Sequence, residues 1–181
     1  MENPFNTPNI KPKRSTLLIV LVVLTLLNNS YGLFVNARQS LNVESAIIKL
    51  EEALDTMEDS LDAIGGGEGA FANIFSGSSF LLERQIEVLD KYGLFYFILL
   101  MLVAIGSIAG ALLMLKLNKL GFHLYASAQV AALLIPLIFG LTSFSNSFLI
   151  AMNVFGILLT ALFIWLYARE LKIFNKVEET A

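Results

Sequence analysis

The chain has no cysteine and only one histidine among its 181 residues. The first absence excludes structural disulfides and thiolate metal sites, and the second excludes a multi-histidine metal cluster within one chain. No Ser/His/Asp arrangement, phosphate-binding loop or other recognisable catalytic motif is present. We therefore predict no cofactor, no enzymatic activity and no nucleic-acid partner.

Asp, Glu, Lys and Arg are missing from four long apolar runs. The runs cover residues 16–35, 93–115, 121–142 and 147–168. Each has the roughly twenty residues with which an α-helix crosses ~30 Å of hydrocarbon, where backbone polar groups must be paired within the segment. We predict an all-α membrane protein in contact with the lipid bilayer. Its four transmembrane helices are expected at residues 15–36, 92–116, 121–141 and 146–169.

The charges outside the runs predict the orientation. The two termini and the short 116–120 turn hold eight basic and four acidic residues, whereas the 36–92 segment holds four basic and eleven acidic residues. Basic residues near span ends favour the cytoplasmic side. We expect both termini to be cytoplasmic, as tails 1–14 and 170–181, and the segment between the first two spans to be extracytoplasmic. The first tail, with three prolines, is expected to be disordered.

The first span has an alternative interpretation as a signal peptide. A basic segment, an apolar stretch and Val35-Asn36-Ala37 resemble a leader with a cleavage site of small residues. Asn28, Asn29 and Ser30 interrupt that stretch, and a second apolar patch follows them. The distance from Arg14 to Ala37 exceeds that of a typical leader, so we favour a retained span.

A heptad pattern follows the first span. Apolar residues recur at alternating spacings of four and three, at Val43, Ile47, Leu50, Leu54, Met57, Leu61 and Ile64. This spacing predicts a helix over about 41–64 with one apolar seam, ended by three glycines at 65–67. A shorter helix over about 79–91 is expected to continue into the second span without a break. Together these helices form a predicted extracytoplasmic helical hairpin, residues 37–91.

The second helix is too short to cover the whole seam, so the tip of the hairpin is a candidate interaction surface. It comprises Met57, Leu61, Ile64, Phe71, Ile74 and Phe75. Either the segment that contains Phe71, Ile74 and Phe75 folds back over the tip as a cap, or the tip and this segment together bind a partner or a second copy. The helix also has an acidic ridge, at Glu51, Glu52, Asp55, Glu58, Asp59 and Asp62. A solvated face is favoured over a divalent-cation site, because carboxylates along one straight helix rarely surround an ion.

The spans contain uncharged polar and small residues that indicate helix packing. Gln129 and Asn153 are expected to bond across helices, and Gly106 and Gly110 form a GxxxG pattern; Gly156 marks a small face on the fourth span. The alternative is a polar path for a solute, lined by Gln129, Asn153 and Asn28. Interfacial roles are predicted for His123, Tyr125, Trp165 and Tyr167. Pro136 is expected to kink the third span.

Three segments of the membrane part are similar to segments of a known group of proteins. Lys116-Leu-Asn-Lys-Leu-Gly-Phe-His-Leu-Tyr125 opens the third span, residues 162–172 end the fourth, and a Lys-Pro-Lys-Arg motif precedes the first. Together they resemble a group of small, uncharacterised four-span bacterial membrane proteins. The resemblance covers the membrane part and implies a bacterial inner-membrane location, with no known activity and no functional residues to transfer.

The sequence therefore leads to two hypotheses of function. The first is a non-enzymatic membrane protein whose outer hairpin mediates assembly or binds a protein partner. The second is a small transporter or channel component with a polar path near Gln129 and Asn153.

Overall fold

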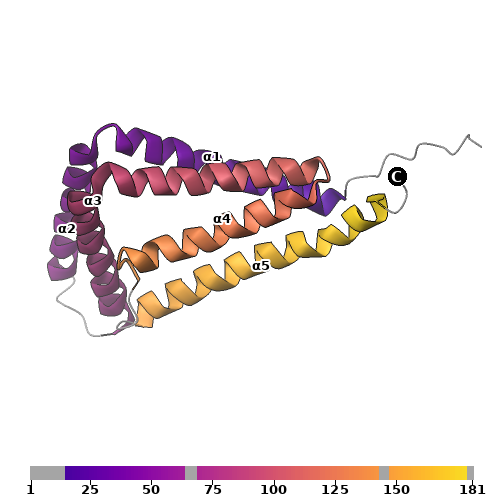
Figure 1. Cartoon of the computed structure of the whole chain (residues 1–181). Coiled ribbons are helices and arrows are strands. Elements are labelled where there is room, and N and C mark those ends of the chain that lie inside the picture. Colours follow the sequence, from indigo (N-terminus) through magenta and orange to yellow (C-terminus); the bar gives the residue numbers. More distant parts are fainter. Residues whose placement is uncertain (1–14, 64–68, 143–146, 179–181) are drawn as a thin grey trace, which may run out of the picture.

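The computed structural model describes residues 15–63, 69–142 and 147–178, and this part of the chain forms five α-helices (Figure 1). They are α1 (Thr16–Ser40), α2 (Val43–Ala63), α3 (Ala70–Leu115), α4 (Lys119–Ile138) and α5 (Ser147–Glu178). All except α2 are long and apolar enough to cross a membrane. The chain is an all-α integral membrane protein with four candidate spans, as the apolar runs predict.

Local sequence signals define several helix ends. The Ser15 hydroxyl accepts a hydrogen bond from the Leu18 N–H at 3.0 Å, and the Asn118 side chain accepts one from Leu120 at 2.9 Å. These N-caps satisfy N–H groups that have no partner within the helix. At the other end of α4, Gly140 adopts a positive φ of 70° and the Leu141 N–H bonds to the Pro136 carbonyl at 2.8 Å. This glycine-dependent cap ends α4 at Ile138, before the expected residue 141.

The spans form a bundle of α1, the second half of α3, α4 and α5, which extend away from α2 (Figure 1). One buried cluster of the bundle comprises Leu18, Leu21, Val22, Ala111, Met114, Tyr125 and Tyr167. Many large apolar side chains of the spans are exposed on the surface of the protein. Such a surface suits lipid contact, because in hydrocarbon there is no hydrophobic driving force that buries apolar groups between helices.

Backbones approach most closely between α3 and α4. A Cβ atom on Gly110 would lie 2.7 Å from the Tyr125 nitrogen, and one on Gly121 would lie 2.6 Å from the Met114 nitrogen. A Cβ on Gly106 would lie 3.4 Å from that of Ala128. The GxxxG residues therefore pack within one chain, and the short 116–118 turn holds the two helices antiparallel.

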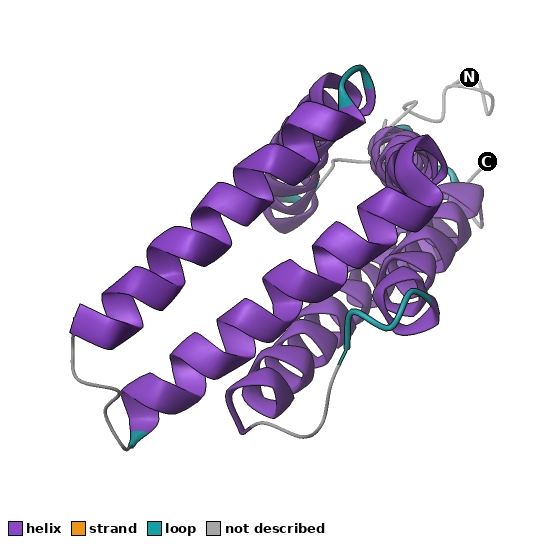
Figure 2. Ribbon diagram, turned by 90° about the vertical axis from the view of Figure 1, so that its left-hand side faces the viewer, coloured by secondary structure: helices purple, strands orange, loops and turns teal. Residues whose placement is uncertain are grey.

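The chain changes direction inside α3, at Gly93. This residue has φ 42° and ψ −117°, which an L side chain rarely adopts. Residues 70–92 of α3 consequently run across the ends of the spans, beside α2, and not along them (Figures 1 and 2). We call α2 together with residues 70–92 the arm.

Two expectations for this region were wrong. The second helix begins at Ala70, not near residue 79, and it does not continue straight into the span. Ser76, Gly77, Ser78 and Ser79 all lie within α3, and Gly77 is buried. Gly93, expected to be tolerated within a continuous helix, bends it.

Some predictions concern residues outside the described part of the chain. They are the disordered tail 1–14, the glycines 65–67, Ile64 and the end of the second tail, 179–181. These predictions stay untested.

Candidate functional site

The arm is held together by the apolar seam of α2. Ala46 of α2 is buried with Val88 and Leu89 of α3, and Val43, Ile47 and Leu50 pack around them. The same cluster includes Tyr96, Phe97 and Ile135 of the bundle. Tyr92 and Tyr96 both make edge-on contacts with Phe139, at ring-centroid distances of 5.0 and 5.2 Å. The arm is therefore fixed on the end of the bundle by buried apolar contacts.

The predicted tip residues fall into two groups. Met57 and Leu61 are half-buried, and the Ser79 hydroxyl donates a hydrogen bond to the Met57 sulfur at 3.5 Å. The early start of α3 places residues 70–79 alongside the distal seam, so the expectation that Met57 and Leu61 lie uncovered was wrong. Phe75 is also half-buried, but Phe71 and Ile74 are exposed, Phe71 by 74%. Two of the five candidates within the described part of the chain, both on the first turns of α3, thus remain accessible apolar residues.

The acidic ridge of α2 lies on the surface of the arm. All six of its carboxylates are exposed: Glu51, Glu52, Asp55, Glu58, Asp59 and Asp62. None of them forms an ion pair with another described residue, and the described residues contain no group of three or more side chains placed to hold a metal ion. The ridge therefore presents uncompensated negative charge to its surroundings.

A second candidate region is a cavity of about 400 Å³ between α1, α4 and α5. Its polar lining comprises Thr25, Asn28, Asn29, Tyr125, Gln129 and Thr160. Three apolar residues, Leu24, Leu159 and Phe163, complete it. The structure thus brings together Asn28 and Gln129, which are about a hundred residues apart in sequence.

Hydrogen bonds fix several groups around this cavity. The Gln129 amide donates to the Ser107 hydroxyl of α3 at 3.2 Å, and the Asn29 amide donates to the Thr25 carbonyl at 2.9 Å. The described residues of this lining contribute amides and hydroxyls but no carboxylate, lysine, arginine or histidine. Such a lining can bind a neutral polar molecule but provides no group for proton transfer near neutral pH.

Asn153 and Gly156 lie elsewhere. They line a separate, mostly apolar cavity of about 420 Å³ between α4 and α5, which also includes Pro136. The structure therefore does not place Asn153 with Gln129 and Asn28. A Cβ atom on Gly156 would meet nothing within 4 Å, so this glycine makes no close helix contact.

No sequence pattern predicted the contacts that hold the C-terminal half of α5. Tyr167 is fully buried, shares a hydrogen bond of 2.9 Å with the Thr25 hydroxyl, and lies 4.5 Å from the Tyr125 ring. Glu170 is also buried and accepts a hydrogen bond from the Ser15 hydroxyl. The interfacial roles predicted for Tyr125 and Tyr167 do not fit these contacts, because each ring is buried between helices. Residues in contact here lie far apart in the chain, so no local spacing could reveal them.

His123 is exposed at the start of α4, where its ring contacts Phe122 at a centroid distance of 5.7 Å. Among the described residues, no hydrogen bond or ion pair joins it to a carboxylate. The position suits the interfacial role expected of it.

Comparison with protein-family models, with curated proteins and with solved structures finds no match to this chain.

Proposed function

We propose that this protein is a non-enzymatic membrane protein that uses its arm for assembly or for binding another protein. One observation carries the proposal. The arm combines an exposed acidic ridge on α2 with exposed Phe71 and Ile74 at the start of α3. Carboxylates without an ion pair to a described residue, on the same arm as accessible apolar side chains, are typical of a surface that meets a partner of basic and apolar character.

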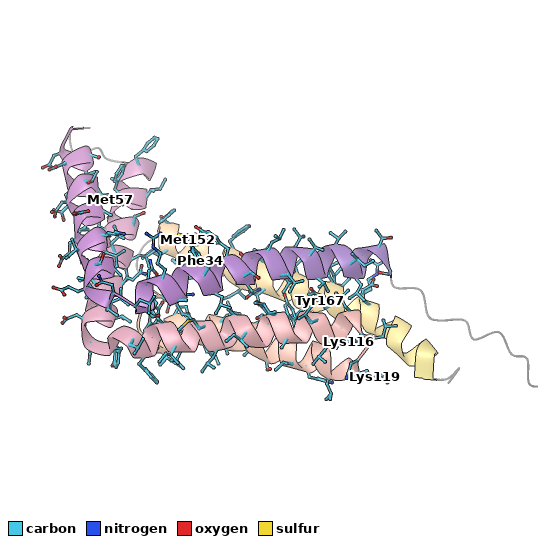
Figure 3. All side chains as sticks on the ribbon, turned by 90° about the horizontal axis from the view of Figure 1, so that it is seen from above. Phe34, Met57, Lys116, Lys119, Met152 and Tyr167 are labelled. Carbon is cyan, nitrogen blue, oxygen red and sulfur yellow. The ribbon has the colours of Figure 1, made fainter. Side chains whose placement is uncertain are left out.

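The proposal includes an orientation and a location. We place the arm on the extracytoplasmic face of a bacterial inner membrane, as a helical hairpin, with both termini in the cytoplasm. Lys116 and Lys119 lie at the end of the bundle remote from the arm, while Phe34 and Met152 lie near it (Figure 3). This separation of basic turn and acidic arm supports the orientation. The resemblance to small four-span bacterial membrane proteins supports the location.

Photo-crosslinking in intact cells tests the proposal. A photoreactive phenylalanine analogue replaces Phe71 on the arm, and in a matched control it replaces Phe155, which is exposed on α5. We expect a crosslinked product from position 71 and none from position 155. Differently tagged copies of the chain then distinguish a second copy from another protein.

Charge neutralisation supplies a second control. Replacing the six ridge carboxylates by their amides should weaken the crosslink, since the ridge is expected to attract the partner's basic residues. If position 71 gives only unlinked monomer at native expression, or gives the same products as position 155, the arm is not an interaction surface.

The polar cavity favours a second candidate function, a component of a transporter or channel for a neutral polar solute. Its support is the grouping of Asn28, Gln129 and Thr160 around one cavity of about 400 Å³ between α1, α4 and α5. Swelling of reconstituted vesicles in glycerol or urea measures the flux. Gln129→Ala should change the flux, whereas Asn153→Ala, outside the cavity, should not. Wild-type vesicles no faster than protein-free ones would exclude this function.

A further inference from the structure

A groove of about 610 Å³ lies where α1 meets α2. Two columns of side chains form its walls. On α1, Tyr31, Phe34 and Arg38 follow one another at spacings of three and four, so they share one helix face. On α2, Ser45 and Lys49 are one turn apart, with Asn42 before them. The groove is therefore basic on both walls and aromatic on one.

The two basic residues of the groove have no ion-pair partner among the described residues. Arg38 and Lys49 form no ion pair and no side-chain hydrogen bond with another described residue. This is unexpected in a segment that holds eleven acidic residues and only four basic ones. Half of the basic residues of that segment thus line one groove, with their charges available to a ligand.

The aromatic wall is of the kind that concentrates near lipid headgroups. Tyr31 and Phe34 are exposed by 72% and 66% on the last turns of a membrane-length helix. Phe34 lies at the end of the bundle where the arm begins (Figure 3). Aromatic side chains concentrate at the boundary between hydrocarbon and headgroups, and Arg and Lys beyond them reach the phosphate layer.

We propose that this groove binds an anionic phospholipid, with the headgroup phosphate between Arg38 and Lys49 and an acyl chain along Tyr31 and Phe34. Arginine and lysine are the usual partners of phosphate oxygens. Asn42 and Ser45 line the same groove and can bond to headgroup hydroxyls. The groove is within the size range of small-molecule sites. The aromatic wall selects a lipid over a free phosphate ion, because only the lipid has an apolar tail to cover it.

Tryptophan quenching by brominated lipids tests the site. The chain has a single tryptophan, so Phe34→Trp combined with Trp165→Phe gives one reporter in the groove. The protein is reconstituted into phosphatidylcholine vesicles in which brominated phosphatidylglycerol or brominated phosphatidylcholine is varied. We expect phosphatidylglycerol to bind at the reporter with a preference of about fivefold or more, since each basic residue near an anionic surface contributes about that factor.

Paired variants assign the preference to the groove. Arg38→Gln with Lys49→Gln should reduce it to near one. Arg84→Gln with Lys91→Gln, which removes the same charge from a different pocket of the arm, should leave it unchanged. If the double variant does not fold, Arg38→Gln and Lys49→Gln alone should each reduce the preference severalfold.

Three results would overturn the proposal. They are equal quenching by both lipids in the parent protein, a preference that survives loss of Arg38 and Lys49, and a preference lost equally with Arg84 and Lys91. Adding inorganic phosphate at constant ionic strength distinguishes binding of a lipid headgroup from binding of a free phosphate ion. Suppression of the preference by phosphate would assign the groove to the free ion and remove the lipid from the proposal.

Discussion

The interface between α3 and α4 and the attachment of α5 differ although both contain glycine on a transmembrane helix. At the first, Gly110 and Gly121 bring two backbones so close that no side chain fits between them. At the second, Gly156 faces open space, and most of α5 between residues 150 and 165 is exposed. Small residues therefore permit close helix contact without causing it. A partner helix with a matching surface must also be held in register, as the short 116–118 turn holds α4.

Among the substitutions that test this contrast, Gly110→Leu is expected to lower the free energy of unfolding most. The new side chain would displace the backbone of Tyr125 and Gly121, so we expect a loss of about 3 kcal/mol in the free energy of unfolding. Gly156→Leu is the matched control and should be nearly neutral. Unfolding in sodium dodecyl sulfate, followed by circular dichroism, measures both. Similar losses for the two variants would contradict the contrast between the interfaces.

Gly93→Ala tests how far the arm depends on one glycine. The conformation at Gly93 is strained for any other residue, so we expect a loss of about 1–3 kcal/mol, or a change in the direction of the arm. Spin labels at Glu52 and Leu102 report that direction through their distance distribution. Gly32→Ala, inside α1 with nothing within 4 Å, should leave both stability and distances unchanged. If Gly93→Ala changes neither the distance distribution nor the stability, the direction of the arm does not depend on this glycine.

Removal of the bond between Thr25 and Tyr167 should loosen α5. We expect Thr25→Val to cost about 1 kcal/mol, because the buried Tyr167 hydroxyl loses its partner in α1. A double-mutant cycle with Tyr167→Phe isolates the pair from other consequences of each substitution. Additive losses in the cycle would show that the hydroxyls do not hold α5.

The smallest effect is expected for Gln129→Leu, which removes the hydrogen bond to Ser107 within the tight interface. Such bonds contribute about 0.6 kcal/mol on average between membrane helices. Because the glycines keep α3 and α4 together, the same unfolding titration should show a change near this size. A loss comparable with that of Gly110→Leu would mean that the amide, and not close backbone contact, holds the two helices together.

Much of the fold could be predicted from the sequence, and the wrong expectations about α3 have one physical cause. Four apolar runs and one heptad pattern located all five described helices, because length and periodicity are local properties. The start of α3 was misplaced since a Gly/Ser segment is compatible with a turn or with a closely packed helix. Which of the two forms depends on the opposing surface of α2.

For the candidate sites too, the sequence identified the polar residues, but only the fold decided which of them lie together. The alternative interpretation grouped Gln129, Asn153 and Asn28 along one polar path; Gln129 and Asn28 line one cavity, whereas Asn153 lies in another. Polarity alone identified all three residues, but the facing direction of each depends on how α5 is rotated against its neighbours. Arg38 and Lys49 were counted only as charges in the sequence, and their position in one groove follows from the turn between α1 and α2.

The sequence by itself determined that this is an all-α membrane protein, that four of its segments suit the bilayer, and that one acidic segment separates the first two. These properties follow from transfer of apolar residues into lipid and from backbone pairing within each helix, and neither requires a partner. Only the tertiary structure decided that the arm runs across the ends of the spans, that Tyr167 is buried, and that α3 and α4 meet at glycines. Those outcomes depend on the fit between surfaces that are distant in the chain, and on a positive φ at Gly93 that no pattern of hydrophobicity encodes.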